Sequence, residues 1–168
     1  MQIQSHAIIA VTTWSALVLH SPSVLSGFSG FNDTGNALVF TGVALFGSFL
    51  PDLDHPRSAI AQSNLFRPIS WGARQFTQHR GALHTLAAAV LIGFASVSVI
   101  PGILGIALAW GYVSHLLADY CTVQGVPLFA PFIREKFRLP IFAVRTGSFG
   151  EYLYMAIIVA GSALYAFR

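Results

Sequence analysis

Long apolar stretches follow one another along this chain, separated by connections that hold most of its polar residues. A membrane-spanning helix needs about 17–25 mostly apolar residues. Five stretches meet or approach this length: His6–Leu25, Gly35–Leu50, Ala82–Ile100, Ile103–Tyr120 and Phe149–Phe167. The pattern therefore predicts an all-α fold, a polytopic membrane helix bundle of about five spans.

The connections between these stretches differ in length and character. Only Pro101-Gly102 separates the third stretch from the fourth, so the two should form an antiparallel hairpin. The connection at 51–81 contains a predicted amphipathic helix, Ala59–Phe76, and the one at 121–148 is rich in Pro, Phe and Arg. Both longer connections should lie as interfacial segments at one membrane face.

Composition supports a membrane protein. Hydrophobic residues make up 55% of the chain, charged residues only 9%, and the mean hydropathy is +0.67. Soluble domains carry about 25% charged residues, so an ordinary soluble domain is excluded. The 168 residues suit a single membrane-embedded domain, 1–168. The first apolar stretch lacks a basic leader and a small-residue cleavage site, so it should be a retained span.

The basic residues indicate an orientation. Eight of the nine lie in the two longer connections: Arg57, Arg67, Arg74, Arg80, Arg134, Lys136, Arg138 and Arg145. If five spans alternate across the membrane, these connections share a side with the N-terminus. Cytoplasmic loops carry the Lys/Arg excess, so the sequence predicts a cytoplasmic N-terminus and an external C-terminus. The net charge of +3 then reflects contact with the membrane surface, and no nucleic-acid partner is expected.

The same alternation gathers ionisable residues at the cytoplasmic face. His20 and Asp33 fall on the opposite side. The residues predicted at the cytoplasmic face are His6, Asp52, Asp54, His55, His79, His84, His115, Asp119 and Glu151. Ionisable groups near a membrane are costly and usually face a partner, a cavity or a pathway. Imidazole and carboxylate groups are ligands for zinc and related divalent ions, so the gathering predicts a metal site.

Local spacing selects the predicted ligands. His115 and Asp119 are four residues apart and project from one side of a helix, and Gly111 leaves room one turn earlier. With one cysteine in the chain, no cysteine cluster contributes. The predicted ligands are His6, Asp52, His55, His79, His84, His115 and Asp119, enough for two or more zinc ions, with manganese as the alternative. His6 could instead be an interfacial anchor.

Four further residues are assigned around these ligands. Asp54 is expected to orient a ligand or to act as a base. Glu151 is expected to be a base, to bind metal or to orient a ligand, with a helix-cap role as the alternative. Arg80 and Arg138 are expected to bind negative charge on the substrate, because a guanidinium group matches two phosphate oxygens. Both arginines could instead be membrane-surface anchors.

Five ordered motifs carry a family resemblance: LPDLDHPRS (50–58), HRGALHT (79–85), GYVSHLLAD (111–119), GVPLFAP (125–131) and FRLP (137–140). They resemble the YdjM-type inner-membrane proteins, a family described as LexA-regulated, metal-dependent hydrolases. The resemblance implies a bacterial inner-membrane hydrolase. The pair His115-x-x-x-Asp119 is distantly similar to the helical pair of zinc-dependent phospholipase C and related single-strand nucleases, but the N-terminal tryptophan of those enzymes is missing here.

Together these features predict a membrane-bound, metal-dependent hydrolase of a phosphoester in a lipid or membrane-associated substrate. A metal-ion transporter is the first alternative, although transport sites usually lie near the bilayer midplane rather than at one face. The second is a structural metal site in a non-catalytic protein. An H-E-x-x-H protease motif is absent from the sequence. The oligomeric state stays open.

Overall fold

The computed structural model describes residues 1–20, 34–55, 58–76, 81–133 and 135–168. The predicted all-α fold is confirmed. The five longer apolar helices are α1 (Ile3–His20), α3 (Thr34–Gly47), α6 (Leu86–Val99), α7 (Ile103–Tyr120) and α8 (Phe149–Ala166). Four shorter elements lie between α3 and α6: the 3-10 helices η1 (Leu50–Asp54) and η2 (Ala82–His84), and the α-helices α4 (Ala59–Gln62) and α5 (Arg67–Phe76).

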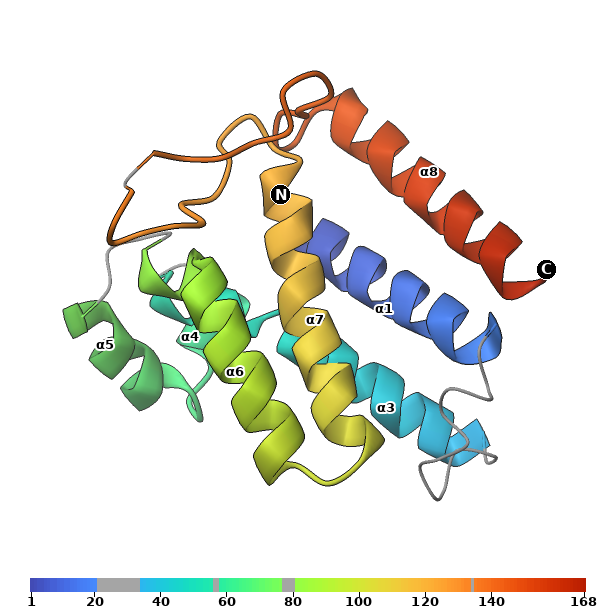
Figure 1. Ribbon diagram of the computed structural model, residues 1–168, viewed down its shortest axis with the longest axis horizontal. Coiled ribbons are helices and arrows are strands. Elements are labelled where there is room, and N and C mark those ends of the chain that lie inside the picture. The colour runs from blue at the N-terminus through green and yellow to red at the C-terminus, as the bar shows by residue number, and fades with distance from the viewer. Residues whose placement is uncertain (21–33, 56–57, 77–80, 134) are drawn as a thin grey trace.

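Helix α7 occupies the middle of the bundle. It packs against α1, α3 and α6, whereas α8 packs mainly against α1 on the outside (Figure 1). One core cluster joins Trp14 of α1 to Phe40 and Ala44 of α3 and to Ile103 and Ala107 of α7. Helices α1, α3 and α6 can therefore each contribute side chains to a site beside α7.

The predicted hairpin is confirmed. Helices α6 and α7 run antiparallel around Pro101-Gly102, where Gly102 has a φ of 63°. The left-handed region suits glycine because it has no Cβ. A Cβ at Gly105 would lie 2.8 Å from the carbonyl oxygen of Ile100, so a glycine is needed where the two helices leave the turn.

Helices α1 and α8 run parallel. Near their N-terminal ends, Ser5 donates a hydrogen bond to Glu151 (2.6 Å), and near their C-terminal ends the rings of His20 and Tyr165 lie 4.1 Å apart. The start of α1 and the end of α8 therefore lie at opposite ends of this pair. A chain that crosses a membrane an odd number of times has its two termini on opposite sides, and the arrangement of α1 and α8 agrees with this.

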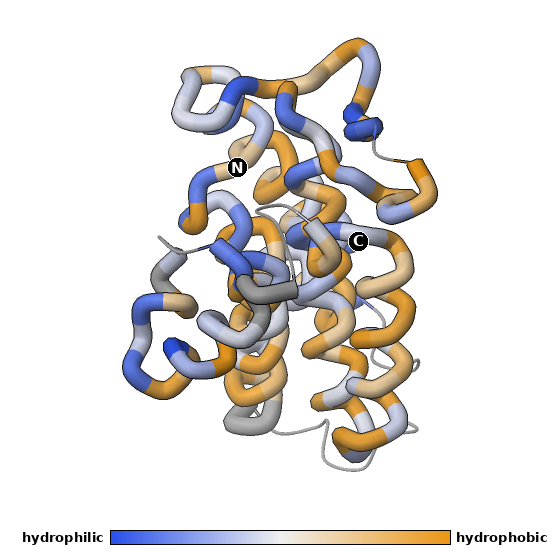
Figure 2. Tube along the Cα trace, turned by 90° about the vertical axis from the view of Figure 1, so that its left-hand side faces the viewer, coloured by the Kyte–Doolittle hydropathy of each residue, from blue (hydrophilic) through white to orange (hydrophobic). Residues whose placement is uncertain are grey.

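Within the part of the chain that the structure describes, three stretches are long and apolar enough to cross a membrane: Ala37–Asp54, Ile103–Tyr120 and Phe149–Ala166. Helix α6 is also apolar but has only 14 residues. Helix α1 has 18 residues, and its polar positions, including His6 and His20, lower its hydropathy. Figure 2 shows hydrophobic colours along the helices and strongly hydrophilic positions gathered mostly toward one end. The total of five spans stays a prediction.

The two longer connections differ from each other in structure. The prediction of a single amphipathic helix over Ala59–Phe76 is wrong in one respect, because this segment forms two helices, α4 and α5. Ser63 adopts an extended conformation (ψ 141°) and ends α4. The connection at 121–148 folds around two isolated β-bridges, Thr122 with Val144 and Val126 with Phe137.

Candidate metal centre

Element ends that are far apart in sequence meet at one end of the bundle. His6 lies in the first turns of α1, Asp52 in η1 and His84 in η2, whereas His115 and Asp119 lie in the last turns of α7. The fractional exposure of His84 is 0%, of His115 and Asp119 1%, and of His6 2%. The structure thus brings together five of the seven predicted metal ligands, almost wholly buried apart from Asp52.

Two imidazoles and two carboxylates face one another in this cluster. Nε2 of His84 lies 3.7 Å from Oδ1 of Asp52 and 3.8 Å from Oδ2 of Asp119. Nε2 of His115 lies 3.8 Å and 3.9 Å from the same two oxygens. Each nitrogen is therefore nearly equidistant from both oxygens. We call these four residues the central quartet.

The separations in the central quartet fit a shared cation better than hydrogen bonds. Nitrogen–oxygen hydrogen bonds span about 2.7–3.2 Å, so distances of 3.7–3.9 Å are too long for them. Two ligands about 2.1 Å from one tetrahedral ion lie about 3.4 Å apart, a few tenths of an ångström less than these nitrogen–oxygen distances. Ligand atoms of Asp52, His84 and His115 all lie within 4.8 Å of one another, and so do those of His6, His115 and Asp119.

His115 is oriented for this role by the end of α3. Its Nδ1 lies 2.6 Å from the carbonyl oxygen of Ser48. Nδ1 therefore carries the proton and donates it to the carbonyl, and Nε2 is left as the electron-pair donor. That Nε2 atom is buried and has no hydrogen-bond partner among the described residues. A backbone carbonyl that fixes the second nitrogen is the usual companion of a metal-ligating histidine.

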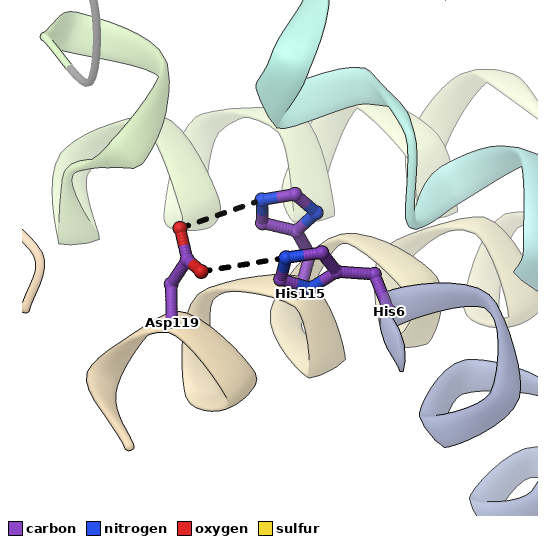
Figure 3. A group of neighbouring side chains, drawn as sticks. All are labelled: His6, His115 and Asp119. Atoms are coloured by element: carbon purple, nitrogen blue, oxygen red, sulfur yellow. Dashed lines mark ion pairs between the residues drawn. The ribbon is translucent and has the colours of Figure 1, made fainter. Parts of the chain in front are cut away.

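The other carboxylate oxygen of Asp119, Oδ1, contacts a second set of groups. Oδ1 lies 3.3 Å from Nε2 of His6 and 2.5 Å from the α-amino group of Met1. The rings of His6 and His115 stack with centroids 3.7 Å apart and planes 8° from parallel. Figure 3 shows the two rings pointing toward different oxygens of the same carboxylate. Asp119 thus faces the central quartet with one oxygen and His6 with the other.

Close packing of α7 on α3 makes this arrangement possible. A Cβ at Gly111 would collide with the carbonyl oxygen of Ala44 and lie 2.8 Å from the nitrogen of Ser48. The missing side chain lets the two backbones meet one turn before His115. The predicted need for space at Gly111 is confirmed, and the space is filled by α3.

η2 is fixed by a hydrogen bond from α7. The buried Tyr112 hydroxyl donates a short hydrogen bond to the carbonyl of Leu83, directly before His84. Thr85 then caps the start of α6 by accepting from the amide of Ala88 (3.1 Å). His84 is therefore positioned from both sides.

The other predicted site residues that the structure describes are not members of the metal-compatible groups. Asp54 is buried at the end of η1 and His55 is half-buried after it, and neither belongs to the metal-compatible groups found among the described residues. Arg138 is exposed and donates to the carbonyl of Val123 (3.1 Å). His79 and Arg80 lie outside the described residues.

Glu151 has a hydrogen-bond set of its own. One of its oxygens accepts from the amide of Gln2 (2.7 Å) and the hydroxyl of Ser5 (2.6 Å), and the other accepts from the amide of Gly147 (2.6 Å). Its side chain is fully buried. These bonds join the start of α8 to the start of α1, the helix that carries His6.

Ser48 and Tyr112 contribute to the site although no sequence pattern predicts them. Ser48 acts through a carbonyl that every residue possesses, so its side chain gives no signal. Tyr112 lies three residues before His115, on the neighbouring turn of α7, and a tyrosine in an apolar helix usually has a hydrogen-bond partner. The sequence could therefore have indicated that the Tyr112 hydroxyl forms a hydrogen bond, but not that Leu83 accepts it.

Comparison with known proteins now identifies the family. Residues 1–167 match the family described as "YdjM inner membrane protein". The chain belongs to the YdjM family. Two proteins named "Inner membrane protein YdjM", from Escherichia coli (strain K12) and Shigella flexneri, are 36% identical over 121 residues, which is 69% of this chain and 61% of theirs. "Uncharacterized protein YvsG" of Bacillus subtilis (strain 168) is 32% identical over 120 residues, 71% of this chain and 72% of its own.

The matched region covers about three fifths of the length of the two YdjM relatives. No solved structure matches the chain. The chain is therefore a membrane protein of the YdjM family whose buried His/Asp groups are arranged so that they could hold a metal ion.

Proposed function

We propose that this protein is a membrane-bound, metal-dependent hydrolase of phosphoesters, and that the central quartet holds its first metal ion. The observation that carries the proposal is the alternation of two imidazole nitrogens with two carboxylate oxygens at 3.7–3.9 Å. An uncompensated cluster of this kind would be costly to bury, and a divalent cation offsets that cost.

Mixed imidazole and carboxylate ligands suit zinc, with manganese as the alternative. His6 and the second oxygen of Asp119 supply part of a neighbouring site. The α-amino group of Met1 lies 2.5 Å from the same oxygen. We place the first ion at the central quartet, to which η1, η2 and α7 all contribute side chains.

Divalent ions in such sites polarise a phosphoryl oxygen and activate water for attack on phosphorus. The protein side chains bind and orient around that chemistry. Asp52 has 26% of its side chain exposed, far more than the other three members of the quartet, so substrate would approach from its side. Ser48 holds the His115 ring, and Tyr112 holds the segment that carries His84.

The residues outside the quartet are given more limited roles. Asp54 is a buried carboxylate next to η1 and keeps its proposed role as a base or an orienting group. Arg138 and Arg80 keep their proposed role in binding substrate charge. Because both oxygens of Glu151 accept hydrogen bonds, we assign Glu151 to positioning α1 and not to proton transfer.

We also propose that the site faces the cytoplasm at the inner membrane. The two relatives from E. coli and S. flexneri are named inner membrane proteins, and the Lys/Arg excess lies in the connections at the site's end of the bundle. A phosphoester borne by a membrane lipid would meet the site at that depth.

A structural metal site is the competing function, because three of the four quartet residues are almost fully buried. Structural zinc is closed by four protein ligands, whereas catalytic zinc keeps an open position. The exposed edge of Asp52 favours the open form.

The two functions separate in one experiment. Purified full-length protein would be stripped with a chelator, reloaded with zinc or manganese, and assayed on lipid phosphomonoesters, lipid phosphodiesters and soluble nitrophenyl phosphates. The test variant is Asp52→Asn, and the matched control is Glu135→Gln, an exposed carboxylate in the 121–148 connection. We expect turnover that depends on metal, a loss of at least ~10-fold in Asp52→Asn and wild-type rates in Glu135→Gln.

If the wild-type protein binds metal tightly and hydrolyses no member of the panel, the structural site is the better account. If Asp52→Asn turns over at the wild-type rate, Asp52 has no part in the reaction.

A further inference from the structure

An apolar groove lies between α6, α7 and the 121–148 connection. It consists of two adjoining cavities of about 650 Å³ and 440 Å³ that share Leu86, Leu128 and Phe129. The first cavity continues along α6 past Ala87 and Val90, and the second continues along α7. All side chains that line the groove are hydrocarbon or aromatic, and Tyr120 alone adds a hydroxyl. We call this feature the α6–α7 groove.

The α6–α7 groove begins beside the segment that carries His84. Leu86, which both cavities share, follows His84 by two residues, whereas Leu116 and Tyr120 project from another side of α7 than His115 and Asp119. The amide of Leu86 donates to the carbonyl of Leu128 (2.8 Å) and fixes the far wall of the groove to the start of α6. An apolar ligand at this end of the groove would therefore lie close to the segment that carries His84.

Charge at the mouth of the groove favours an anionic group. Phe137 lines the groove and is flanked by Lys136 and Arg138, both exposed. Among the described residues of 121–148 the single acidic side chain is Glu135. A hydrocarbon groove with basic residues and a cation site at one end is complementary to a lipid that bears a phosphate.

The groove is also open at the surface of the helix bundle. The α6 side chains on its rim are well exposed, 48% for Leu86 and 68% for Leu91. A chain already dissolved in the bilayer could enter sideways without passing through water. Entry of this kind suits an acyl chain better than a peptide, whose backbone would leave polar groups unsatisfied in the groove.

We propose that the α6–α7 groove seats a hydrocarbon chain of an anionic lipid phosphoester and thereby brings its phosphate to the metal centre. The inference rests on the proposed function and specifies its substrate class: a lipid with at least one long chain, in preference to a soluble phosphate ester.

The test uses lipid retention, so it does not depend on turnover. Ala87 lines the groove and is exposed, so Ala87→Trp would fill the groove without disturbing the core. The matched control is Ala160→Trp, another exposed alanine, on the apolar helix α8 away from the groove. Metal-loaded full-length protein in detergent would be titrated with dioleoyl phosphatidate, and binding would be followed by native mass spectrometry.

We expect one phosphatidate per wild-type chain and per Ala160→Trp chain. In Ala87→Trp the affinity should fall at least ~10-fold, as expected when about two methylene groups are displaced from the groove. Glycerol phosphate, which has the headgroup without chains, should compete only weakly with phosphatidate.

Equal phosphatidate affinity in wild type and Ala87→Trp would overturn the inference. Binding of many weakly held phosphatidate molecules per chain, as expected of annular lipid, would overturn it as well. The proposed function is tested by hydrolysis, independently of phosphatidate binding. If Ala87→Trp loses phosphatidate but no phosphoester is hydrolysed by wild type, the groove stands and the hydrolase proposal fails. If both proteins hydrolyse lipid and soluble phosphoesters equally, the hydrolase proposal stands and the groove fails.

Discussion

Replacing Gly111 by alanine is the most informative change outside the ligands themselves. The added methyl group would collide with the carbonyl oxygen of Ala44 and lie 2.8 Å from the nitrogen of Ser48. These are backbone atoms of α3, so no side-chain rotation relieves the contact and the helices must separate. Separation would stretch the 2.6 Å contact between Ser48 and His115.

Two magnitudes follow from this displacement. Overpacking of a close contact costs about 1–3 kcal/mol, and alanine recovers about 1 kcal/mol of helix propensity, so the net destabilisation should be about 0–2 kcal/mol. Loss of a group that orients a ligating histidine usually weakens metal binding about 10–100-fold. A loss of this size corresponds to about 1.4–2.8 kcal/mol of binding free energy, so metal affinity should fall at least as much as stability.

The assay would measure zinc affinity by competition with a chromophoric chelator, together with thermal unfolding in detergent. Gly42→Ala on α3 is the matched control, because a Cβ there meets no atom within 4 Å. The control should bind zinc as wild type does and unfold at an equal or higher temperature. Wild-type zinc affinity in Gly111→Ala would refute the link between α3 packing and the metal centre.

Two further predictions concern residues that position the site. Glu151→Gln should lower the free energy of unfolding by about 1–3 kcal/mol, because charge-assisted hydrogen bonds to α1 and to Gly147 are lost, while zinc stays bound at the central quartet; loss of zinc at unchanged stability would instead make Glu151 a ligand. Tyr112→Phe should cost about 1 kcal/mol and weaken zinc binding severalfold, because the hydroxyl no longer holds Leu83 beside His84. An unchanged zinc affinity in Tyr112→Phe would show that η2 is held by other contacts.

The gathering of ligands was predictable because it follows from topology. Once the apolar stretches are placed alternately across a bilayer, His6, His84 and His115 must fall at the same end. The structure places them there, with Asp52 and Asp119 between them. The helical spacing of His115 and Asp119 likewise gave their common face without any tertiary information.

The finer assignments were not predictable, because they depend on which backbone atoms meet. Asp52, Asp54 and His55 are neighbours in sequence, and both carboxylates belong to the 3-10 helix η1, yet Asp52 is the one that faces His84. Glu151 has the residue type of a base, yet three donors from α1 and the preceding turn surround it. The contact of Ser48 with His115 depends on two glycine-mediated helix approaches, at Gly47 and Gly111.

The central claim is that the quartet holds a metal ion, and metal content tests it most directly. Full-length protein purified without chelator would be analysed for divalent metals per chain, beside the double variant His84→Ala/His115→Ala and the control His20→Ala, whose side chain lies at the other end of α1. We predict at least one zinc or manganese ion per chain in wild type and in His20→Ala, and almost none in the double variant at unchanged helical content. Folded wild-type protein that takes up no divalent ion, even after incubation with zinc and manganese, would contradict the account.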